Sequence, residues 1–191
     1  EMSRLRLRDD VQHPWFNERV SNICITAGTL HERKGLFYLI GAISLLDKKG
    51  IDVRLMILGD GPQEGELREL VNDLGLSGRV TFVGSVSNPL KYFSRAKVFV
   101  LSSLQEGMPN VLIESMLAGC TPVATDCPTG PREILANGRY GYLVPMRDSV
   151  ALASGIESAL SHPVPPEVLA EAVVPFRKEA VLAKLFQLLD I

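Results

Sequence analysis

Short apolar runs rich in β-branched residues alternate with amphipathic stretches along most of this 191-residue chain. Six runs have the length and composition of strands: Ile23–Ala27, Val53–Gly59, Val80–Val83, Val98–Leu101, Thr121–Ala124 and Tyr142–Val144. Helical stretches lie between them, at Gly35–Lys48, Glu64–Leu74, Pro89–Ser94 and Val111–Ala118, with a short helical turn at Arg132–Asn137. Apolar strands that alternate with helices form a parallel sheet covered on both faces. The sequence therefore predicts an α/β fold with a doubly wound, Rossmann-like parallel sheet.

The two ends of the chain lack this alternation. Residues 1–20 have no sustained period, so we expect a linker or an edge segment there, with Trp15 and Phe16 on the rim of the domain. Residues 21–162 are expected to form the sheet domain. Residues 163–191 are expected to form a C-terminal helical tail, because helical stretches at Ser149–Leu160 and Lys178–Leu189 are split by prolines.

Composition narrows the class of protein. Hydrophobic residues make up 46% of the chain, and the formal net charge of −2 leaves no basic surplus for binding nucleic acid. Neither the histidines nor Cys24, Cys120 and Cys127 show metal-ligand spacing, and we expect reduced thiols. No apolar run reaches membrane-spanning length, and the N-terminal residues are too charged for a signal peptide. These features predict a cytoplasmic protein.

Ligands of doubly wound sheets bind beyond the carboxyl ends of the strands. There, one predicted loop carries Gly28 and ends in Arg33-Lys34, and the next is Gly59-Asp60-Gly61-Pro62. The glycines either let the backbone approach a ligand or serve as plain turn residues. Arg33 fits a solvated surface charge. Lys34 either faces water or binds an anion, since a cation at a helix N-terminus is mildly unfavourable by itself.

The stretch Glu106–Glu114 contains a loop that leads into an apolar helix. Free backbone N–H groups at about Asn110, Val111 and Leu112, together with the helix dipole, predict a binding site for a phosphate. Glu114 stands among side chains that we expect in the core, and a buried charge needs a partner. A capping box is the alternative explanation, but with Asn110 as the cap its acidic position is Ile113, so the register does not fit.

Together these segments resemble a known family. Glu106 and Glu114, with seven residues between them, follow Ser102-Ser103 and precede Ala118–Val123. This arrangement resembles the signature of retaining glycosyltransferases of the GT-B fold that use sugar nucleotides (glycosyl transferases group 1, family 4 type). Further segments resemble motifs of the same family in the same order: Gly28–Gly35, Gly59–Pro62, Val80–Gly84 and Thr125–Leu135. The resemblance extends from Ile23 to Ile191 and implies the C-terminal, donor-binding domain, which is one half of a GT-B fold.

The resemblance also implies roles for matching residues. Lys34 would neutralise the donor diphosphate, Glu106 would bind hydroxyls of the transferred sugar, and Glu114 would accept hydrogen bonds from the ribose. The other implied donor contacts are Gly28, Thr29, Gly59, Val86, Asn88, Gly107, Met108, Pro109, Asn110 and Val111. Lys34 and Glu106 are the expected catalytic residues, and a positive site aimed at the leaving diphosphate would stabilise its charge. No cofactor and no metal is implied.

Two departures from the family pattern bear on activity. Thr29 stands where the family usually has an arginine, and one lost charge-assisted contact costs roughly 1.5–3 kcal/mol unless Arg33 or Arg132 replaces it. The family's N-terminal acceptor domain is absent from this sequence, so residues 1–20 are interpreted as the end of an interdomain linker. The isolated chain is therefore expected to bind a nucleoside diphosphate or its sugar conjugate and to transfer nothing.

The resemblance favours a particular substrate class. The segment Cys127–Arg132 resembles bacterial members that build polysaccharides or lipid-linked oligosaccharides from UDP-sugars, often N-acetylhexosamines, at the inner face of the cell membrane. The expected partners are a nucleotide-sugar donor and a glycan or lipid-linked acceptor. Two alternatives remain open: a sugar-nucleotide-binding module that has lost catalysis, which Thr29 supports, and a sugar-nucleotide epimerase of the same fold.

Overall fold

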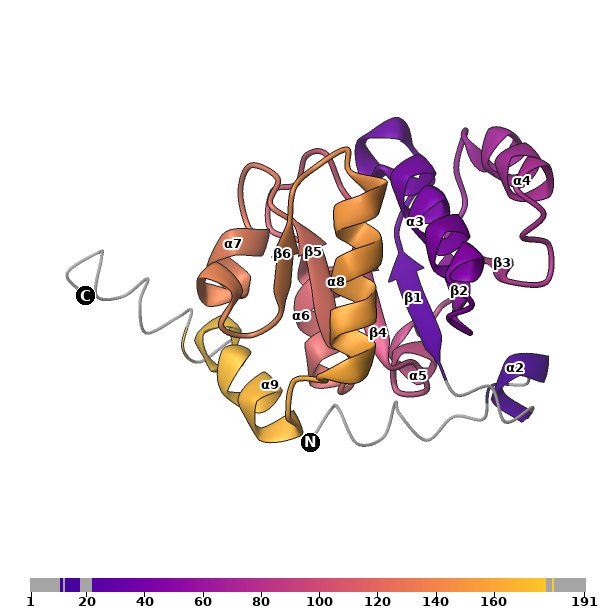
Figure 1. The fold of residues 1–191 in the computed structure, drawn as a ribbon. Coiled ribbons are helices and arrows are strands. Elements are labelled where there is room, and N and C mark those ends of the chain that lie inside the picture. The colour runs from indigo at the N-terminus through magenta and orange to yellow at the C-terminus, as the bar shows by residue number, and fades with distance from the viewer. Residues whose placement is uncertain (1–10, 12, 18–21, 178–179, 181–191) are drawn as a thin grey trace.

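The computed structural model describes residues 11, 13–17, 22–177 and 180 (Figure 1). Its six strands form one parallel sheet in the order β3-β2-β1-β4-β5-β6. The strands are β1 (Ile23–Ala27), β2 (Arg54–Leu58), β3 (Val80–Gly84), β4 (Val98–Leu101), β5 (Thr121–Thr125) and β6 (Tyr142–Val144). This sheet confirms the predicted doubly wound α/β fold, because consecutive parallel strands are joined by helical crossovers.

The helices lie where the apolar period predicts them, with ends that differ by one residue at most from Gly35 to Ala118. They are α2 (Pro14–Asn17), α3 (Leu36–Lys48), α4 (Glu64–Asp73), α5 (Leu90–Phe93), α6 (Asn110–Leu117), α7 (Pro131–Ile134), α8 (Ser149–Ser161) and α9 (Pro166–Ala172). Three short 3₁₀ turns add η1 (Glu32–Lys34), η2 (Ala136–Gly138) and η3 (Val174–Phe176). The helix predicted at 178–189 lies almost entirely outside the described residues.

Each face of the sheet is covered by its own set of helices. Helices α3, α4 and α8 bury Leu39, Leu67 and Ile156 against one face, and α3 and α8 stand side by side in front of the sheet in Figure 1. Helices α5, α6 and α9 bury Phe93, Leu112 and Leu169 against the other face. Both faces of the strands are therefore dry, which explains why the strand sequences are apolar throughout.

The proline-rich segment does more than separate two helices. Pro166 is the first residue of α9, a position where its fixed φ and missing N–H are tolerated. Leu169, Ala172 and Val173 are buried in the same cluster as α6. The first part of the predicted tail therefore packs on the sheet domain, and the boundary at residue 162 stays a prediction.

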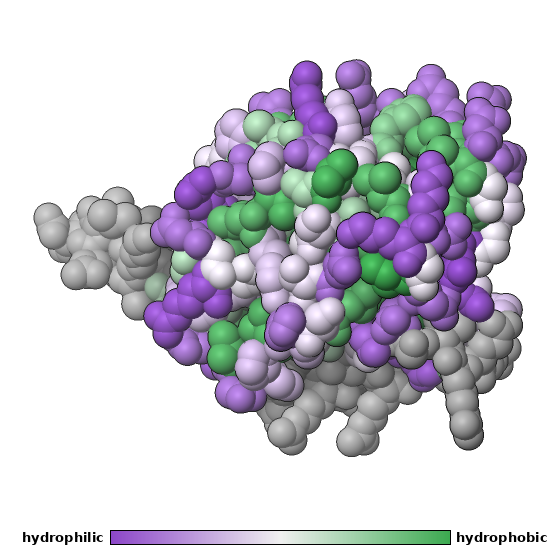
Figure 2. Space-filling model, in the orientation of Figure 1, coloured by the Kyte–Doolittle hydropathy of each residue, from purple (hydrophilic) through white to green (hydrophobic). Residues whose placement is uncertain are grey.

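The predicted rim position of Trp15 and Phe16 is confirmed. Both side chains are partly buried against the cluster that contains α6, and the guanidinium carbon of Arg54 lies 5.3 Å from the centre of the Trp15 ring. The strand-end loops gather at the upper edge in Figure 1, and Figure 2 shows hydrophilic side chains projecting from this edge.

Gly35 offers a test of how tightly the loops after β1 and β4 are joined. Its backbone has a left-handed φ of 61°, and a Cβ there would collide with the Ser102 carbonyl oxygen. We expect Gly35→Ala to lower the free energy of unfolding by about 2–4 kcal/mol, the sum of left-handed strain and overpacking. Gly50 has a φ of 76° with nothing near it, so Gly50→Ala should cost only about 1 kcal/mol. Urea unfolding measures both, and equal losses would contradict the close approach.

Candidate functional site

The strand order places a topological switch point between β1 and β4. From β1 the chain winds outward through β2 and β3, then returns to the other side of β1 at β4. The loops that follow β1 and β4 therefore leave the sheet edge in opposite directions, toward α3 on one face and α6 on the other. A crevice at such a point is the usual ligand site of this fold.

Lys34 and Glu106 meet at this switch point. The Lys34 Nζ atom lies 2.6 Å from Glu106 Oε1, and the Ser103 hydroxyl donates to the same oxygen at 2.6 Å. Their side chains are only 17% and 11% exposed. An ammonium has three donors, so two remain for another acceptor, and Glu106 Oε2 has no hydrogen bond among the described residues. Lys34 can therefore donate to an anion, and Glu106 can accept from a hydroxyl group, while the contact between the two side chains stays intact.

Glycine residues allow the strand-end loops to pack against each other. The aliphatic part of Lys34 lies over Gly28, at 3.3 Å from the position of a Cβ there. Gly59, with a φ of 116°, lies so close to the Gly28 carbonyl that a side chain would collide with it. Gly61 lies equally close to the Leu30 backbone. The sequence left two interpretations of these glycines, a close approach to a ligand and a plain turn. In the structure they allow one loop to pack closely against another.

A crevice of about 240 Å³ lies beyond the ends of β1, β2 and β3. Gly28, over which the Lys34 side chain lies, is part of its lining. Among the predicted residues, Gly28, Thr29, Gly59 and Val86 line it, whereas Asn88 lies in the same loop as Val86 but outside the lining. Sequence reasoning assigned no role to Asp60, Ser85 and Pro89, which also line the crevice. The Ser85 hydroxyl donates to Asp60 at 2.7 Å, so two polar groups face a ligand there together.

The loop before α6 corrects part of the predicted anion site. Pro109, not Asn110, is the cap residue, and it has no side-chain cap bond. The Asn110 N–H donates to the Met108 carbonyl and the Leu112 N–H to the Pro109 carbonyl, both at 2.9 Å, so these two amides are not free as predicted. Among the described residues, the N–H groups of Gly107, Met108 and Val111 have no acceptor. Three free backbone amides therefore remain around Pro109, which has no side-chain group to cap the helix.

Glu114 is less buried than its apolar neighbours suggested. Leu112 and Met116 are buried, but Leu117 is 49% exposed, and the Glu114 side chain is intermediate. It makes no hydrogen bond or ion pair with any residue that the structure describes, which excludes the capping box. Glu114 also lines none of the described cavities. Partial burial raises the pKa of the Glu114 carboxyl, because water is removed from the charged form.

The structure distinguishes the two cations considered as replacements for the family's arginine at Thr29. The Arg132 guanidinium is engaged by the Asp126 carboxylate, with Nε donating to Oδ1 at 2.9 Å. Arg33 is exposed, and its side chain makes no bond with the residues that the structure describes. Arg33 is therefore the free cation nearest in sequence to Lys34.

Two serines after β4 position the Lys34 and Glu106 pair, a role that sequence reasoning missed. The Ser102 hydroxyl donates to the Lys34 carbonyl at 2.8 Å, and Ser103 donates to Glu106 as described above. Both serines are buried. Buried hydroxyls directly after a buried strand were the available signal, because such groups need partners.

Three further expectations concern cysteine, metal and membrane. All three cysteines are buried and free, which confirms the absence of disulfides. Within the described ranges, no group of three or more His, Cys, Asp and Glu side chains could hold a metal ion. No helix in the part of the chain that the structure describes is both long enough and apolar enough to cross a bilayer.

Comparison with known proteins identifies the family. Residues 21–162 match the family "Glycosyl transferases group 1", so this chain belongs to that family. A Campylobacter jejuni N-acetylgalactosamine-N,N'-diacetylbacillosaminyl-diphospho-undecaprenol 4-alpha-N-acetylgalactosaminyltransferase is 34% identical over 71% of this chain and 36% of its own length. The lipopolysaccharide core biosynthesis glycosyltransferase LpsE of Rhizobium meliloti is 34% identical over 87% of this chain and 49% of its own length. The chain thus spans less than half of these relatives.

Solved structures confirm the GT-B class of fold. The crystal structure of Anabaena HepE in complex with UDP superposes with a TM-score of 0.81 over 92% of this chain and 51% of that one, at 22% sequence identity. This chain therefore contains a domain of the glycosyl transferases group 1 family, with the GT-B class of fold.

Glu114 provides a test of the site that is independent of any ligand. Its pKa is raised from 4.5, so the folded state binds more protons than the unfolded state, and stability falls as pH rises through that range. At pH 7 we expect Glu114→Gln to raise the free energy of unfolding by up to about 1 kcal/mol, since partial exposure screens the charge. The gain should shrink below pH 4.5. Urea unfolding at both pH values measures it.

The control for this prediction is Glu69→Gln, which changes an exposed carboxylate on α4. It should leave stability within ±0.5 kcal/mol at either pH, as is usual for surface substitutions. A loss of stability in Glu114→Gln at pH 7 would contradict the unfavourable placement of its charge.

Proposed function

We propose that this chain is the C-terminal, donor-binding half of a retaining glycosyltransferase that takes a sugar from a UDP-sugar. The observation that carries the proposal is the placement of the Lys34 and Glu106 pair at the switch point of the sheet, directly beside the crevice. This arrangement supplies a cation for a diphosphate and a carboxylate for a sugar hydroxyl within one contact distance of each other.

The donor is proposed to lie along the carboxyl edge of the sheet. The base enters the crevice near the main chain of Val86 and beside Asn88, and the diphosphate reaches Lys34 past Gly28, Thr29 and Gly59. This direction is supported by the crevice, which runs from the β3 end to the β1 end of the sheet. A uridine base is further supported by the UDP in the HepE structure.

The transferred sugar is proposed to bind at Glu106. The Oε2 atom of Glu106 accepts a hydrogen bond from a hydroxyl of the sugar. The free backbone amides of Gly107, Met108 and Val111, around Pro109, donate to the sugar and to the outer phosphate. Glu114 accepts hydrogen bonds from the ribose hydroxyls, a role supported by its lack of a partner among the residues that the structure describes. Asn110 contributes through its side chain, because its backbone N–H already donates to the Met108 carbonyl.

Catalysis in this proposal is electrostatic. As the glycosidic bond breaks, the leaving nucleoside diphosphate gains charge, which Lys34 and the free amides stabilise without reorganising. Neither a cofactor nor a metal takes part. The anomeric configuration of the sugar is retained in the product, as the resemblance to the retaining family implies.

The acceptor is proposed to be a glycan or a lipid-linked sugar, bound mainly by an N-terminal domain of the complete protein. The length of the relatives supports this division, since the chain covers less than half of each. The names of two relatives support the acceptor class, one with diphospho-undecaprenol and one with lipopolysaccharide core. N-acetylhexosamine is the proposed sugar, and the cytoplasm, at the inner face of the cell membrane, is the proposed location.

A binding module without catalysis is the second candidate. Thr29 favours it, because an expected diphosphate cation is replaced by a neutral hydroxyl and Arg132 is engaged by Asp126. The two candidates differ in turnover by the complete protein, not in donor binding.

Donor binding is tested by titration calorimetry of the 191-residue chain with UDP, GDP and ADP. We expect UDP to bind most tightly, and Lys34→Met to weaken its affinity by about 10- to 100-fold, the cost of one charge-assisted contact. Lys49→Met is the matched control, since Lys49 also pairs with a carboxylate, that of Glu157 at 2.9 Å, but lies on the surface. No heat with any of the three nucleotides would contradict the proposal.

Transfer is tested with the complete protein. We expect it to convert a UDP-sugar and an acceptor into a product with the α-configuration of the donor, and we expect the 191-residue chain to form none. Proton NMR of the product reads the anomeric configuration. Inversion would exclude the retaining mechanism, and donor binding without turnover by the complete protein would favour the binding module.

A further inference from the structure

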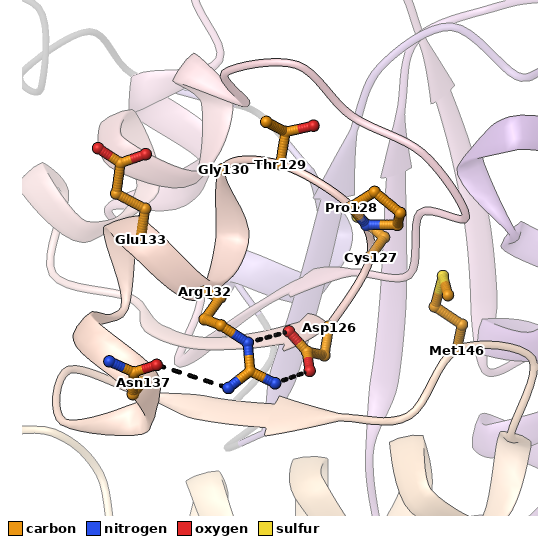
Figure 3. A pocket seen from close by; sticks show the side chains of 9 residues that line it. All are labelled: Asp126, Cys127, Pro128, Thr129, Gly130, Arg132, Glu133, Asn137 and Met146. Carbon is orange, nitrogen blue, oxygen red and sulfur yellow. Dashed lines mark hydrogen bonds and ion pairs between the residues drawn. The ribbon is translucent and has the colours of Figure 1, made fainter.

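A second cavity, larger than the crevice, lies beyond the ends of β5 and β6. Its volume is about 630 Å³, and Figure 3 shows it from close by. Its lining comes from the loop after β5, from α7 and η2, and from the loop after β6. None of the residues assigned to the donor lines it, so the proposed function leaves this cavity without a ligand.

The polar groups of the cavity form an ordered array. The Arg132 guanidinium lies between the Asp126 carboxylate and the Asn137 side-chain amide, as the dashed lines in Figure 3 show. Arg132 Nη1 donates to Asn137 Oδ1 at 3.5 Å, which leaves the amide NH₂ group of Asn137 without a partner among the described residues. The Thr129 hydroxyl is likewise unpartnered within the described part of the chain. Hydrogen-bond donors and acceptors are thus available to a ligand.

The charges of the lining discriminate between possible ligands. Asp126 and Glu133 contribute two carboxylates against the single cation of Arg132, and that cation is already paired. A phosphate or diphosphate would meet a net negative charge there. A neutral polyol fits better, because its hydroxyls can bond to carboxylate, amide and hydroxyl groups while its C–H face packs on apolar side chains. Pro128 and Met146 supply such apolar groups.

The cavity directly adjoins the loop that carries Glu106. A Cβ at Gly130, which lines the cavity, would lie 2.5 Å from both the Gly107 carbonyl oxygen and Pro109 Cδ. Burial raises the pKa of the Cys127 thiol in the same wall, and the Glu106 carboxylate adds to that effect, which again places the two walls close together. The cavity therefore begins where the proposed sugar subsite ends.

The order of the strands gives the direction. Along the sheet edge, the crevice lies at β3, β2 and β1, the Lys34 and Glu106 pair at β1 and β4, and the cavity at β5 and β6. Neighbouring strands are about 5 Å apart, so the cavity lies one or two sugar widths beyond Glu106. Base, diphosphate and transferred sugar would thus be followed by one further position in line.

We infer that this cavity binds a neutral saccharide, namely the carbohydrate end of the acceptor, with Asp126, Asn137 and Thr129 as the recognising side chains. The inference rests on the proposed function, and it adds an acceptor subsite to a domain that is otherwise assigned to the donor. Arg132 acts as a positioning residue, because its guanidinium bonds to both the Asp126 and the Asn137 side chain.

The experiment uses the ¹⁵N-labelled 191-residue chain saturated with UDP and titrated with methyl α-N-acetylgalactosaminide. We expect the amide signals of Thr129, Gly130 and Gly138 to shift. Those of Gly28 and Gly59, which line the donor crevice, and of the nearby Gly61 should stay in place. Inorganic pyrophosphate, titrated in the same way, should leave the cavity signals unchanged.

Two variants locate the site. Asn137 has a left-handed φ of 58°, so Asn137→Gly removes the amide group without backbone strain. Asp126→Asn removes the carboxylate charge that Arg132 pairs with. We expect each variant to weaken saccharide binding by about 10-fold, the loss of one hydrogen bond to a charged or amide group. Asp47→Asn is the matched control, because Asp47 also pairs with an arginine, Arg79 Nε at 3.0 Å, on the opposite part of the surface.

The outcomes separate this inference from the proposed function. Saccharide-dependent shifts only at Gly28, Gly59 and Gly61, or none at tens of millimolar saccharide, overturn the acceptor subsite. Equal weakening of saccharide binding in Asp47→Asn overturns it as well. If pyrophosphate shifts the signals of the cavity, the ligand of the cavity is an anion and the saccharide subsite is refuted. Failure of UDP to bind refutes the donor role alone, since the saccharide titration is read equally well without UDP.

Discussion

The arrangement of the candidate site depends above all on one contact between two loops that are far apart in sequence. Lys34 and Glu106 are joined at 2.6 Å although 72 residues separate them, and they meet because β1 and β4 are neighbours in the sheet. Two buried serines and the left-handed Gly35 hold the same loops together. A partly buried ion pair adds little net stability, because desolvation offsets the attraction. Its main effect is to fix the positions of a cation and a carboxylate at the switch point.

The same site carries unfavourable features that a ligand could relieve. Glu114 has no partner among the described residues and its pKa is raised, so its charge is less favourable in the folded chain than in water. Three amides around Pro109 lack acceptors among the described residues. Natural proteins tolerate such costs where they serve binding, and removing them stabilises the fold at the expense of function. In the proposed assignment, the diphosphate and hydroxyls of the donor would satisfy these amides and this carboxylate.

Strand order turns the sheet edge into a linear series of positions. A crevice near Val86, the Lys34 and Glu106 pair, and the cavity at Asp126 and Arg132 follow one another along this edge. Glycines let the loops between these positions pack closely against each other, so that neighbouring positions adjoin. In the proposed assignment, an extended substrate would bind along this one edge, from its base to the group that receives the sugar.

The sequence alone determined the strands and helices, because apolar period is a local property of the chain. It drew attention to Lys34 through its place after a strand, and to Glu106 through the resemblance to a family motif. Tertiary structure decided what depends on neighbours far along the chain. The exposure of Leu117 left Glu114 only partly buried, and Pro109 as cap turned the Asn110 amide inward. The Asp126 and Arg132 array likewise arose from loop geometry. The burial and the hydrogen-bond partners of a residue depend on which distant segments pack against it. The spacing of residues along the sequence does not show which segments those are.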